Sequence, residues 1–426
     1  MLSALISVFI ITYLAIAFEH PLKLNKSASA LLGAGVLWTL LALGSDDAHL
    51  VGKQLDNTLV STAQIVFFLI GAMTIVEVVD AHQGFEVVTS RIRTSSLTTL
   101  IWLISWVTFF LSAILDNLTT TIVMVSLLPK LLAQREDRLY VAGMIIIAAN
   151  AGGAWSPIGD VTTTMLWIGG HITPAVIVRS LLLPSVVNLL VPLLVITWLF
   201  KGQRVQAPHL AHSKAPHTSK FERNLMFFLG LGLLVAVPAF KTFTHLPPFM
   251  GALLGLGLLW VVGDRLHQHK SPEERNHLDL STALSRIDLA SIAFFIGILL
   301  AVATLEHTHI LVTLAIWLDH AIGRQDLIIM LIGILSAVVD NVPLVAASIG
   351  MYNLNQYPTD SFLWEFLAYC AGTGGSILII GSAAGVAAMG IEKIDFMWYL
   401  RRISWLAGLG YVAGALVYVT ERSPVL

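Results

Sequence analysis

The sequence predicts an all-α polytopic membrane protein built from two inverted repeats. The chain of 426 residues is 56% hydrophobic and only 12% charged, with a mean hydropathy of +0.82. Soluble domains are usually about 25% charged, so this composition indicates a membrane protein. Many of its apolar segments reach the ~20 residues that a helix needs to cross a bilayer. A Leu-Ser-Ala-x-x-Asp-Asn motif occurs once in each half, at residues 111–117 and 335–341.

Twelve apolar spans alternate with polar loops, and each half of the chain holds six of them. They cover approximately residues 2–18, 28–44, 60–80, 97–133, 139–169, 175–200, 224–240, 247–263, 289–305, 326–351, 362–390 and 397–420. A polar stretch separates the two sets. The chain therefore divides into a first inverted repeat at residues 1–200, a cytoplasmic linker at 201–223 and a second inverted repeat at 224–426.

Two spans in each half carry polar or helix-breaking residues at their centres. Spans 97–133 and 326–351 hold the Asp-Asn pairs, which indicates re-entrant helical hairpins with Asp-Asn at their tips. Residues 150–159 (NAGGAWSPIG) and 372–382 (GTGGSILIIGS) are rich in Gly and Ser, which predicts two broken helices. Non-helical backbone at membrane depth is tolerated only where it is buried in protein or lines a cavity. These four segments are therefore expected to meet.

The number of crossings sets the orientation of the two halves. A re-entrant hairpin adds no crossing, so each half crosses five times: three simple helices, one broken helix and one final helix. An odd number inverts the second half and leaves both termini on one side. Nineteen Lys and Arg residues fall in loops on the side reached after the first helix, and five fall on the other side. The positive-inside rule therefore predicts a cytoplasmic linker, periplasmic termini, and hairpins that enter from opposite sides.

Acids within apolar spans indicate where the chemistry takes place, because a charge at membrane depth is costly and usually functional. Asp116, Asp160 and Asp340 are expected to bind Na⁺, since hard cations prefer oxygen ligands. Asp160 could instead cap the second half of its broken helix. Glu77 is a further candidate, on a proton path. The full set of oxygen-bearing candidates for ion and proton binding is Asp116, Asn117, Thr119, Thr120, Asn150, Ser156, Asp160, Thr163, Asp340, Asn341, Thr373, Ser376 and Ser382.

The residue types at these positions favour exchange of a cation for protons. A partly desolvated carboxylate can bind either a cation or a proton near neutral pH. If binding one ion expels the other, alternating access to the two sides gives antiport. No Lys or Arg lies in either tip or either helix break, which argues against an anionic cargo. A sodium-coupled anion carrier, for dicarboxylates or arsenite, is the alternative on the same scaffold.

Other classes of function are not supported by the sequence. The chain lacks H-E-x-x-H and G-x-S-x-G motifs, so we expect no enzymatic activity. The net charge of −2 does not suggest a nucleic-acid partner. We expect no cofactor beyond the transported ions, and the lipid bilayer as the surrounding medium.

At these residues the chain closely resembles the NhaD-type sodium/proton antiporters of the ion-transporter superfamily. The resemblance covers essentially the whole length, and its specific parts are the Asp-Asn tips and NAGGAWSPIGD at 150–160. Dicarboxylate symporters of the superfamily carry Ser-Asn-Thr where this chain has Asp116 and Asp340. The resemblance implies export of sodium or lithium driven by proton entry, at alkaline pH, from the bacterial inner membrane, and a homodimer. The second tip has Val342-Pro343 in place of the Thr run of the first, which argues against two equivalent ion sites.

Overall fold

The computed structural model describes residues 1–17, 19–45, 47–89, 94, 96–205, 218–271, 275, 278–338 and 340–422. Most of the predicted linker and the four C-terminal residues lie outside this part, so the predicted position of the C-terminus is not tested. Within the described residues the secondary structure is helical apart from one isolated bridge between Ser96 and Arg204. The all-α prediction is confirmed. Seven described helices are long and apolar enough to cross a membrane, and one bent pair of helices gives an eighth.

The helices of the first half stop and restart where the sequence predicts breaks. They are α1 (Leu2–Ala17), α2 (Glu19–Leu22), α3 (Lys26–Gly44), α4 (Ala48–Ala81), α5 (Glu86–Thr89), α6 (Leu97–Leu115), α7 (Asn117–Ser126), α8 (Leu128–Leu131), α9 (Arg135–Ala154), α10 (Val161–Ile168) and α11 (Pro174–Leu199). A single residue, Asp116, separates α6 from α7. Six residues, 155–160, separate α9 from α10.

The second half has helix breaks at equivalent places. Its helices are α12 (Lys220–Thr244), α13 (Pro248–His267), α15 (Leu280–Arg286), α16 (Leu289–His307), α17 (Ile310–Ile322), α18 (Gln325–Leu335), α19 (Asn341–Met351), α20 (Phe362–Gly374), α21 (Ala383–Glu392), α22 (Phe396–Arg402) and α23 (Ser404–Arg422). The chain breaks between α18 and α19 and between α20 and α21, as predicted. One helix of the second half, α17, falls in a stretch that the predicted apolar spans leave out.

Each break is followed by a helix whose first N–H groups are capped by a side chain. Asp116 caps α7, Asp160 caps α10, Asp340 caps α19 and Ser382 caps α21. Such a cap stabilises the start of a helix by about 1 kcal/mol. The chain therefore resumes a helix immediately after each break, and each capping side chain is held at the break.

The two halves make equivalent close contacts where one helix crosses another. A Cβ added to Gly152 would lie 2.1 Å from the carbonyl oxygen of Phe109, where α9 crosses α6. A Cβ added to Gly374 would lie 2.0 Å from the carbonyl oxygen of Gly333, where α20 crosses α18. Real Cβ atoms do not approach so closely, so only glycine fits at either crossing.

A serine hydroxyl joins the same helices in each half. Ser112 Oγ donates to the carbonyl oxygen of Ala149 at 2.6 Å, which ties α6 to α9. Ser336 Oγ donates to the carbonyl oxygen of Ala371 at 2.9 Å, which ties the end of α18 to α20. The duplicated Leu-Ser-Ala motif therefore makes the same contact twice.

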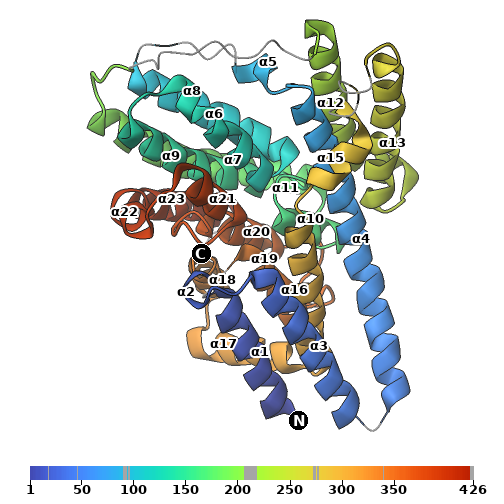
Figure 1. Cartoon of the computed structure of the whole chain (residues 1–426). Coiled ribbons are helices and arrows are strands. Elements are labelled where there is room, and N and C mark those ends of the chain that lie inside the picture. Colours follow the sequence, from blue (N-terminus) through green and yellow to red (C-terminus); the bar gives the residue numbers. More distant parts are fainter. Residues whose placement is uncertain are drawn as a thin grey trace.

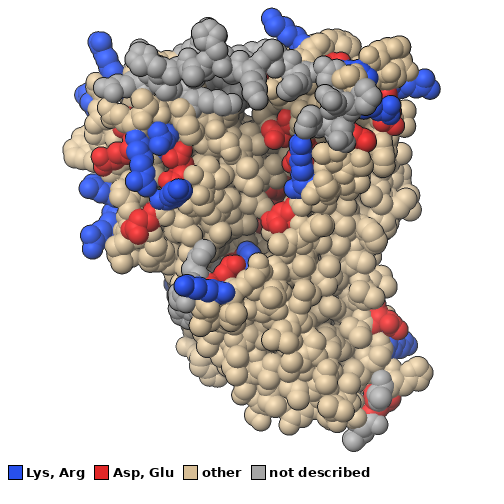
Figure 2. Space-filling model, viewed as in Figure 1, with Lys and Arg blue, Asp and Glu red and all other residues tan. Residues whose placement is uncertain are grey.

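The helices form two groups, and the long helix α4 belongs to the first of them (Figure 1). α12 and α13 pack on its later part, while α16 packs on α4 and α3. The second group contains α6, α7, α9, α11, α20 and α23, which pack on one another. Lys and Arg side chains on the viewed face gather mainly in its upper part, and acidic side chains lie in a hollow between the groups (Figure 2). The breaks that carry the candidate residues lie where the groups meet.

Candidate ion-binding site

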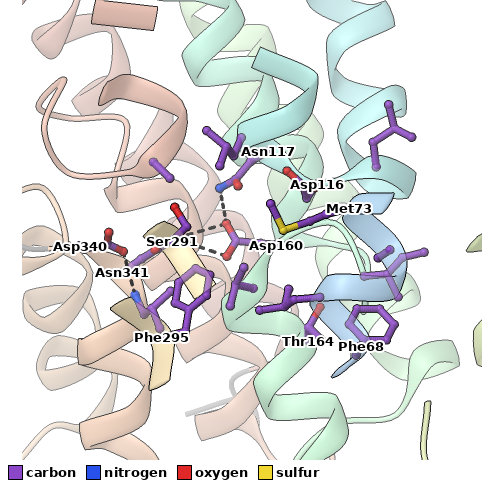
Figure 3. Close-up of a pocket in the computed structure, with 18 of the residues that line it drawn as sticks. Phe68, Met73, Asp116, Asn117, Asp160, Thr164, Ser291, Phe295, Asp340 and Asn341 are labelled. Atoms are coloured by element: carbon purple, nitrogen blue, oxygen red, sulfur yellow. Dashed lines mark hydrogen bonds between the residues drawn. The ribbon is translucent and has the colours of Figure 1, made fainter. Parts of the chain in front are cut away.

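Three of the four breaks line a cavity of about 50 Å³ in the interior (Figure 3). Asp116 and Asn117 come from the α6–α7 break, Asp160 from the α9–α10 break, and Asp340 and Asn341 from the α18–α19 break. A water molecule needs at least ~10–15 Å³ of such space, so the cavity can hold a few waters or a partly dehydrated small cation. The structure therefore brings together the three acids that are predicted to bind sodium.

Asp160 is the centre of the hydrogen-bond network. Its Oδ1 accepts from the backbone N of Thr162 at 2.8 Å and from its Oγ1 at 2.7 Å. Its Oδ2 accepts from Asn117 Nδ2 at 2.5 Å and from Asn341 Nδ2 at 3.2 Å. The side chain is fully enclosed, with the residue 1% exposed. Asp160 therefore caps α10 and also joins the tips from both halves.

Asn150 extends this network to the fourth break. Its Oδ1 accepts from Asn117 Nδ2 at 3.0 Å. Its Nδ2 donates to Ser376 Oγ at 2.9 Å and to Ser382 Oγ at 3.0 Å. All four residues are buried. The two broken helices are thus linked through one amide.

Asp116 has a different environment, because its hydrogen bonds come from its own helix. Its Oδ1 accepts from the backbone N of Thr119 at 2.7 Å, and its Oδ2 accepts from Thr119 Oγ1 at 2.8 Å. Its backbone has φ 123°, a conformation that a non-glycine residue seldom adopts. Among the described residues, no Lys or Arg lies within ion-pair distance of this half-buried carboxylate. It lines the cavity with its charge uncompensated by any base.

Asp340 has a basic partner that the sequence analysis did not identify. Lys26 Nζ lies 3.0 Å from Asp340 Oδ2, and the two side chains are 20% and 10% exposed. The same ammonium lies 4.6 Å from the centre of the Phe294 ring. No Lys or Arg belongs to a tip, as the sequence shows, but the expected lack of positive charge at the tips is wrong, because Lys26 reaches the second tip from the start of α3. A cation at a helix N-terminus opposes the helix dipole, which is a signal that Lys26 has an acidic partner.

The remaining candidates support the breaks and make no hydrogen bond to the Asp160 carboxylate within the described part of the chain. The hydroxyls of Ser156, Thr163 and Thr373 donate to backbone carbonyl oxygens at 2.5, 2.9 and 2.6 Å. Thr120 Oγ1 is buried and makes no hydrogen bond within the described part of the chain. Three of these hydroxyls are therefore already used in packing.

Glu77 lies outside the cavity. It is one turn beyond Met73, the last α4 residue that lines the cavity. Its Oε1 lies 3.7 Å from Arg286 Nη1, and its side chain is 26% exposed. Glu77 therefore sits between the ion cavity and the end of α4, in an ion pair with α15.

The residues around the cavity suit a small hard cation. Three carboxylates and one ammonium surround it, so negative charges exceed positive ones by two when all are ionised. Apolar groups of α4, including Phe68 and Met73, complete the wall and exclude bulk water. A low-dielectric environment of this kind strengthens the attraction between a cation and a carboxylate.

Comparisons with known proteins agree with this chemistry. A family model described as "Citrate transporter" (CitMHS) matches residues 13–372. The chain is 51% identical to "Sodium/proton antiporter 1" of Arabidopsis thaliana over 423 residues, which is 99% of this chain and 72% of that protein. It is 47% identical to "Sodium/proton antiporter 2" of the same plant, over 97% and 98% of the two chains. It is 30% identical to "Na(+)/H(+) antiporter NhaD" of Vibrio cholerae, over 98% and 91%.

Proposed function

The chain belongs to the CitMHS family and, within it, to the NhaD-type sodium/proton antiporters, and from this membership we propose that it exports sodium or lithium in exchange for protons. The observation that carries the proposal is the convergence of Asp116, Asp160 and Asp340 on one small cavity. Such a group of interior acids holds cations more readily than anions. Relatives whose names specify sodium and protons support the choice of ions.

In the proposed mechanism, Asp116 is the carboxylate at which sodium and protons compete. Among the described residues only its own helix donates to it, so its remaining lone pairs are available to the cavity. A proton bound there removes the charge that attracts sodium, and bound sodium excludes the proton. Alternating access of the cavity to the two sides then couples the opposite movements of the two ions.

Asp160 and Asp340 have supporting roles in this mechanism. Asp160 holds Asn117 and Asn341 together, so movement of either tip is transmitted to the other. It also contributes negative charge to the bound ion. Asp340 forms an ion pair with Lys26, so the cavity is most negative near the other two acids.

The alternative of a sodium-coupled anion carrier is favoured by the description of the family, which names citrate, and by one structural observation. Lys26 brings a positive charge to the wall of the cavity. However, Asp340 lies 3.0 Å from this ammonium and compensates its charge, so little of it is left for an anion. The assay below therefore includes anions.

Reconstituted vesicles with an interior pH dye provide the test. Addition of sodium or lithium to vesicles that hold a pH gradient is expected to dissipate the gradient, and potassium is expected to have no effect. Asp116→Asn vesicles serve as the control for leakage. A response to succinate, citrate or arsenite in the absence of any response to sodium would contradict the proposal.

We also propose that the two halves are inverted repeats whose hairpins enter from opposite sides. The equivalent contacts of Gly152 and Gly374 support a repeat, and the distribution of Lys and Arg supports the inversion. Single cysteines beside the two tips, reacted from each side of sealed vesicles, test the arrangement. Opposite accessibility is expected for the two tips.

The location and assembly of the protein are further proposals. Bacterial relatives named NhaD support an inner membrane, and the charge bias supports periplasmic termini. We propose a homodimer, as the sequence resemblance implies. Membrane fractionation of the native host and the mass of the detergent-solubilised protein test these two points.

A further inference from the structure

A second and larger cavity lies next to the ion-binding cavity. It has a volume of about 360 Å³ and is lined by α4, α10, α16 and α19, the same four helices that contribute to the smaller cavity. One water occupies ~30 Å³ in the liquid, so this cavity has room for a hydrated ion. No residue predicted as an ion ligand lines it.

One face of α4 runs through both cavities. Thr58, Thr62 and Ile65 line the large cavity, and Leu69 and Ala72 line the small one. These residues recur every three or four positions, which places them on one side of a helix. The two cavities therefore lie along a single line parallel to α4.

The other walls have the same arrangement. On α16, Glu306, Val302 and Leu299 line the large cavity, and Phe295, one turn earlier, lines the small one. On α19, Ala346 lines the large cavity and Val342, again one turn earlier, lines the small one. A helical turn rises 5.4 Å, so the cavities are separated by about one turn of packed side chains.

The separating layer is apolar. Ile65, Phe68, Met165, Phe295 and Val342 are all buried, with exposures of 2–8%. Each lines one of the two cavities. A hydrated ion does not pass such a layer without its opening, so this layer has the position and chemistry of a closed gate.

The large cavity has several polar side chains in its otherwise apolar wall, and no strong base among the described residues. Polar side chains of α4 line it, although α4 is otherwise apolar enough to span a membrane, and such groups need contact with water. Glu306 is exposed, and within the described chain no Lys or Arg lies at ion-pair distance from its carboxylate. Thr58 Oγ1 and His307 Nε2, 3.1 Å apart, join the α4 and α16 walls. The described residues that line the cavity include no Lys or Arg.

We propose that this cavity is the outer vestibule through which hydrated sodium exchanges with the ion site, and that Glu306 concentrates cations in it. The proposal rests on the antiport proposed above. The outer side is inferred from the charge bias of the loops, which puts the beginning of α4 and the end of α16 outside. The vestibule is closed from the site by the apolar layer in the conformation described here.

Thiol labelling tests the vestibule without any measurement of transport. Cys370, the only cysteine, is buried, so the background is low. Ser61→Cys, in the cavity wall, is expected to react with an impermeant cationic methanethiosulfonate from outside about tenfold faster than Val60→Cys. Val60 is the matched control, because it is 61% exposed and does not line the cavity. Equal rates at the two positions, or reaction of Ser61→Cys from the inside only, would overturn the vestibule.

The effect of the Glu306 charge is tested in the protein that carries Ser61→Cys. Glu306→Gln is expected to lower the ratio of cationic to anionic reagent rates at Ser61→Cys about tenfold, because one unit charge acting across ~6 Å of water changes the two rates about threefold each, in opposite directions. It should also raise the KM for sodium about threefold at low ionic strength, with an unchanged maximal rate. Both effects should vanish near 1 M salt, where screening acts over ~3 Å. A merely structural role would not depend on salt in this way.

Glu136→Gln is the matched control, since Glu136 is an exposed acid in the first turn of α9. It should leave both the reagent ratio and the KM unchanged. Unchanged values in Glu306→Gln as well would contradict the role of Glu306. Labelling at Ser61→Cys without sodium-driven exchange in the unmodified protein would contradict antiport but leave the cavity accessible, so the two failures are distinguishable.

Discussion

The Asp116 break and the Asp340 break share a motif and differ in electrostatics. Each acid ends a Leu-Ser-Ala-x-x-Asp-Asn run, caps the following helix and lines the same cavity. Asp116 is bound by Thr119 of its own helix, whereas Asp340 pairs with Lys26 of a distant one. One acid therefore keeps its charge available and the other has it neutralised.

The break before α10 and the break before α21 also differ in charge. Asp160 caps α10 and accepts hydrogen bonds from both tips. The residue that caps α21 in the second half is the neutral Ser382. The two halves thus share their packing contacts, but among the described break residues the acids without a basic partner lie in the first half only, which favours a single exchange site over two equivalent ones.

The largest expected difference in exchange and stability is between Asp116→Asn and Asp340→Asn. Asp116→Asn should abolish exchange, by roughly 100-fold or more, because the competing charge is lost. It should leave stability unchanged or raised, since no base is left unpaired. Asp340→Asn should lower the melting temperature of the detergent-solubilised protein. Exchange in vesicles and thermal unfolding, measured on both variants, check this contrast, and wild-type exchange in Asp116→Asn would remove Asp116 from the mechanism.

The pairing of Lys26 with Asp340 is tested by a double-mutant cycle. Lys26→Met leaves an acid unpaired near the interior, which should destabilise the protein by about 1–3 kcal/mol, less than for a fully buried pair because both groups are partly exposed. Lys26→Met combined with Asp340→Asn should recover at least half of that loss. Additive losses in denaturant unfolding would mean that the two groups do not interact.

A smaller effect is expected at Thr119, which has no counterpart in the second tip. Thr119→Val removes the hydroxyl donor to Asp116 and keeps the backbone donor, so the KM for sodium should change about three- to tenfold. Thr119→Ser keeps the hydroxyl and should behave as wild type. If the Ser and Val variants give the same KM, the hydroxyl does not position the carboxylate.

The smallest effect is expected at Ser382. Ser382→Ala removes the cap of α21 and one acceptor of Asn150, which should lower stability by about 1 kcal/mol. Exchange should persist, because Ser376 still accepts from Asn150. Asp160→Ala, its counterpart in the first half, should instead abolish exchange. Equal transport rates in these two variants would mean that the two halves contribute equally to exchange.

Much of the architecture could be predicted from the sequence. Eleven of the twelve predicted spans coincide with helices that start or end within a few residues of the prediction, while the third span is part of the longer α4, which begins at Ala48. Hydrophobic runs and helix breakers act locally, so they can be recognised without knowledge of the fold. The predicted spans do not include α17, in which Asp319 and His320 interrupt the apolar run near its end.

The sequence by itself determined that the chain is a helical membrane protein with duplicated acids at helix breaks. These properties follow from composition, repetition and capping residues within short segments. Only the tertiary structure decided which acid is neutralised, since Lys26 and Asp340 are 314 residues apart. It also decided that Asp160 joins both tips and that one face of α4 lines two cavities. Such contacts depend on how distant helices pack, and no local pattern specifies that packing.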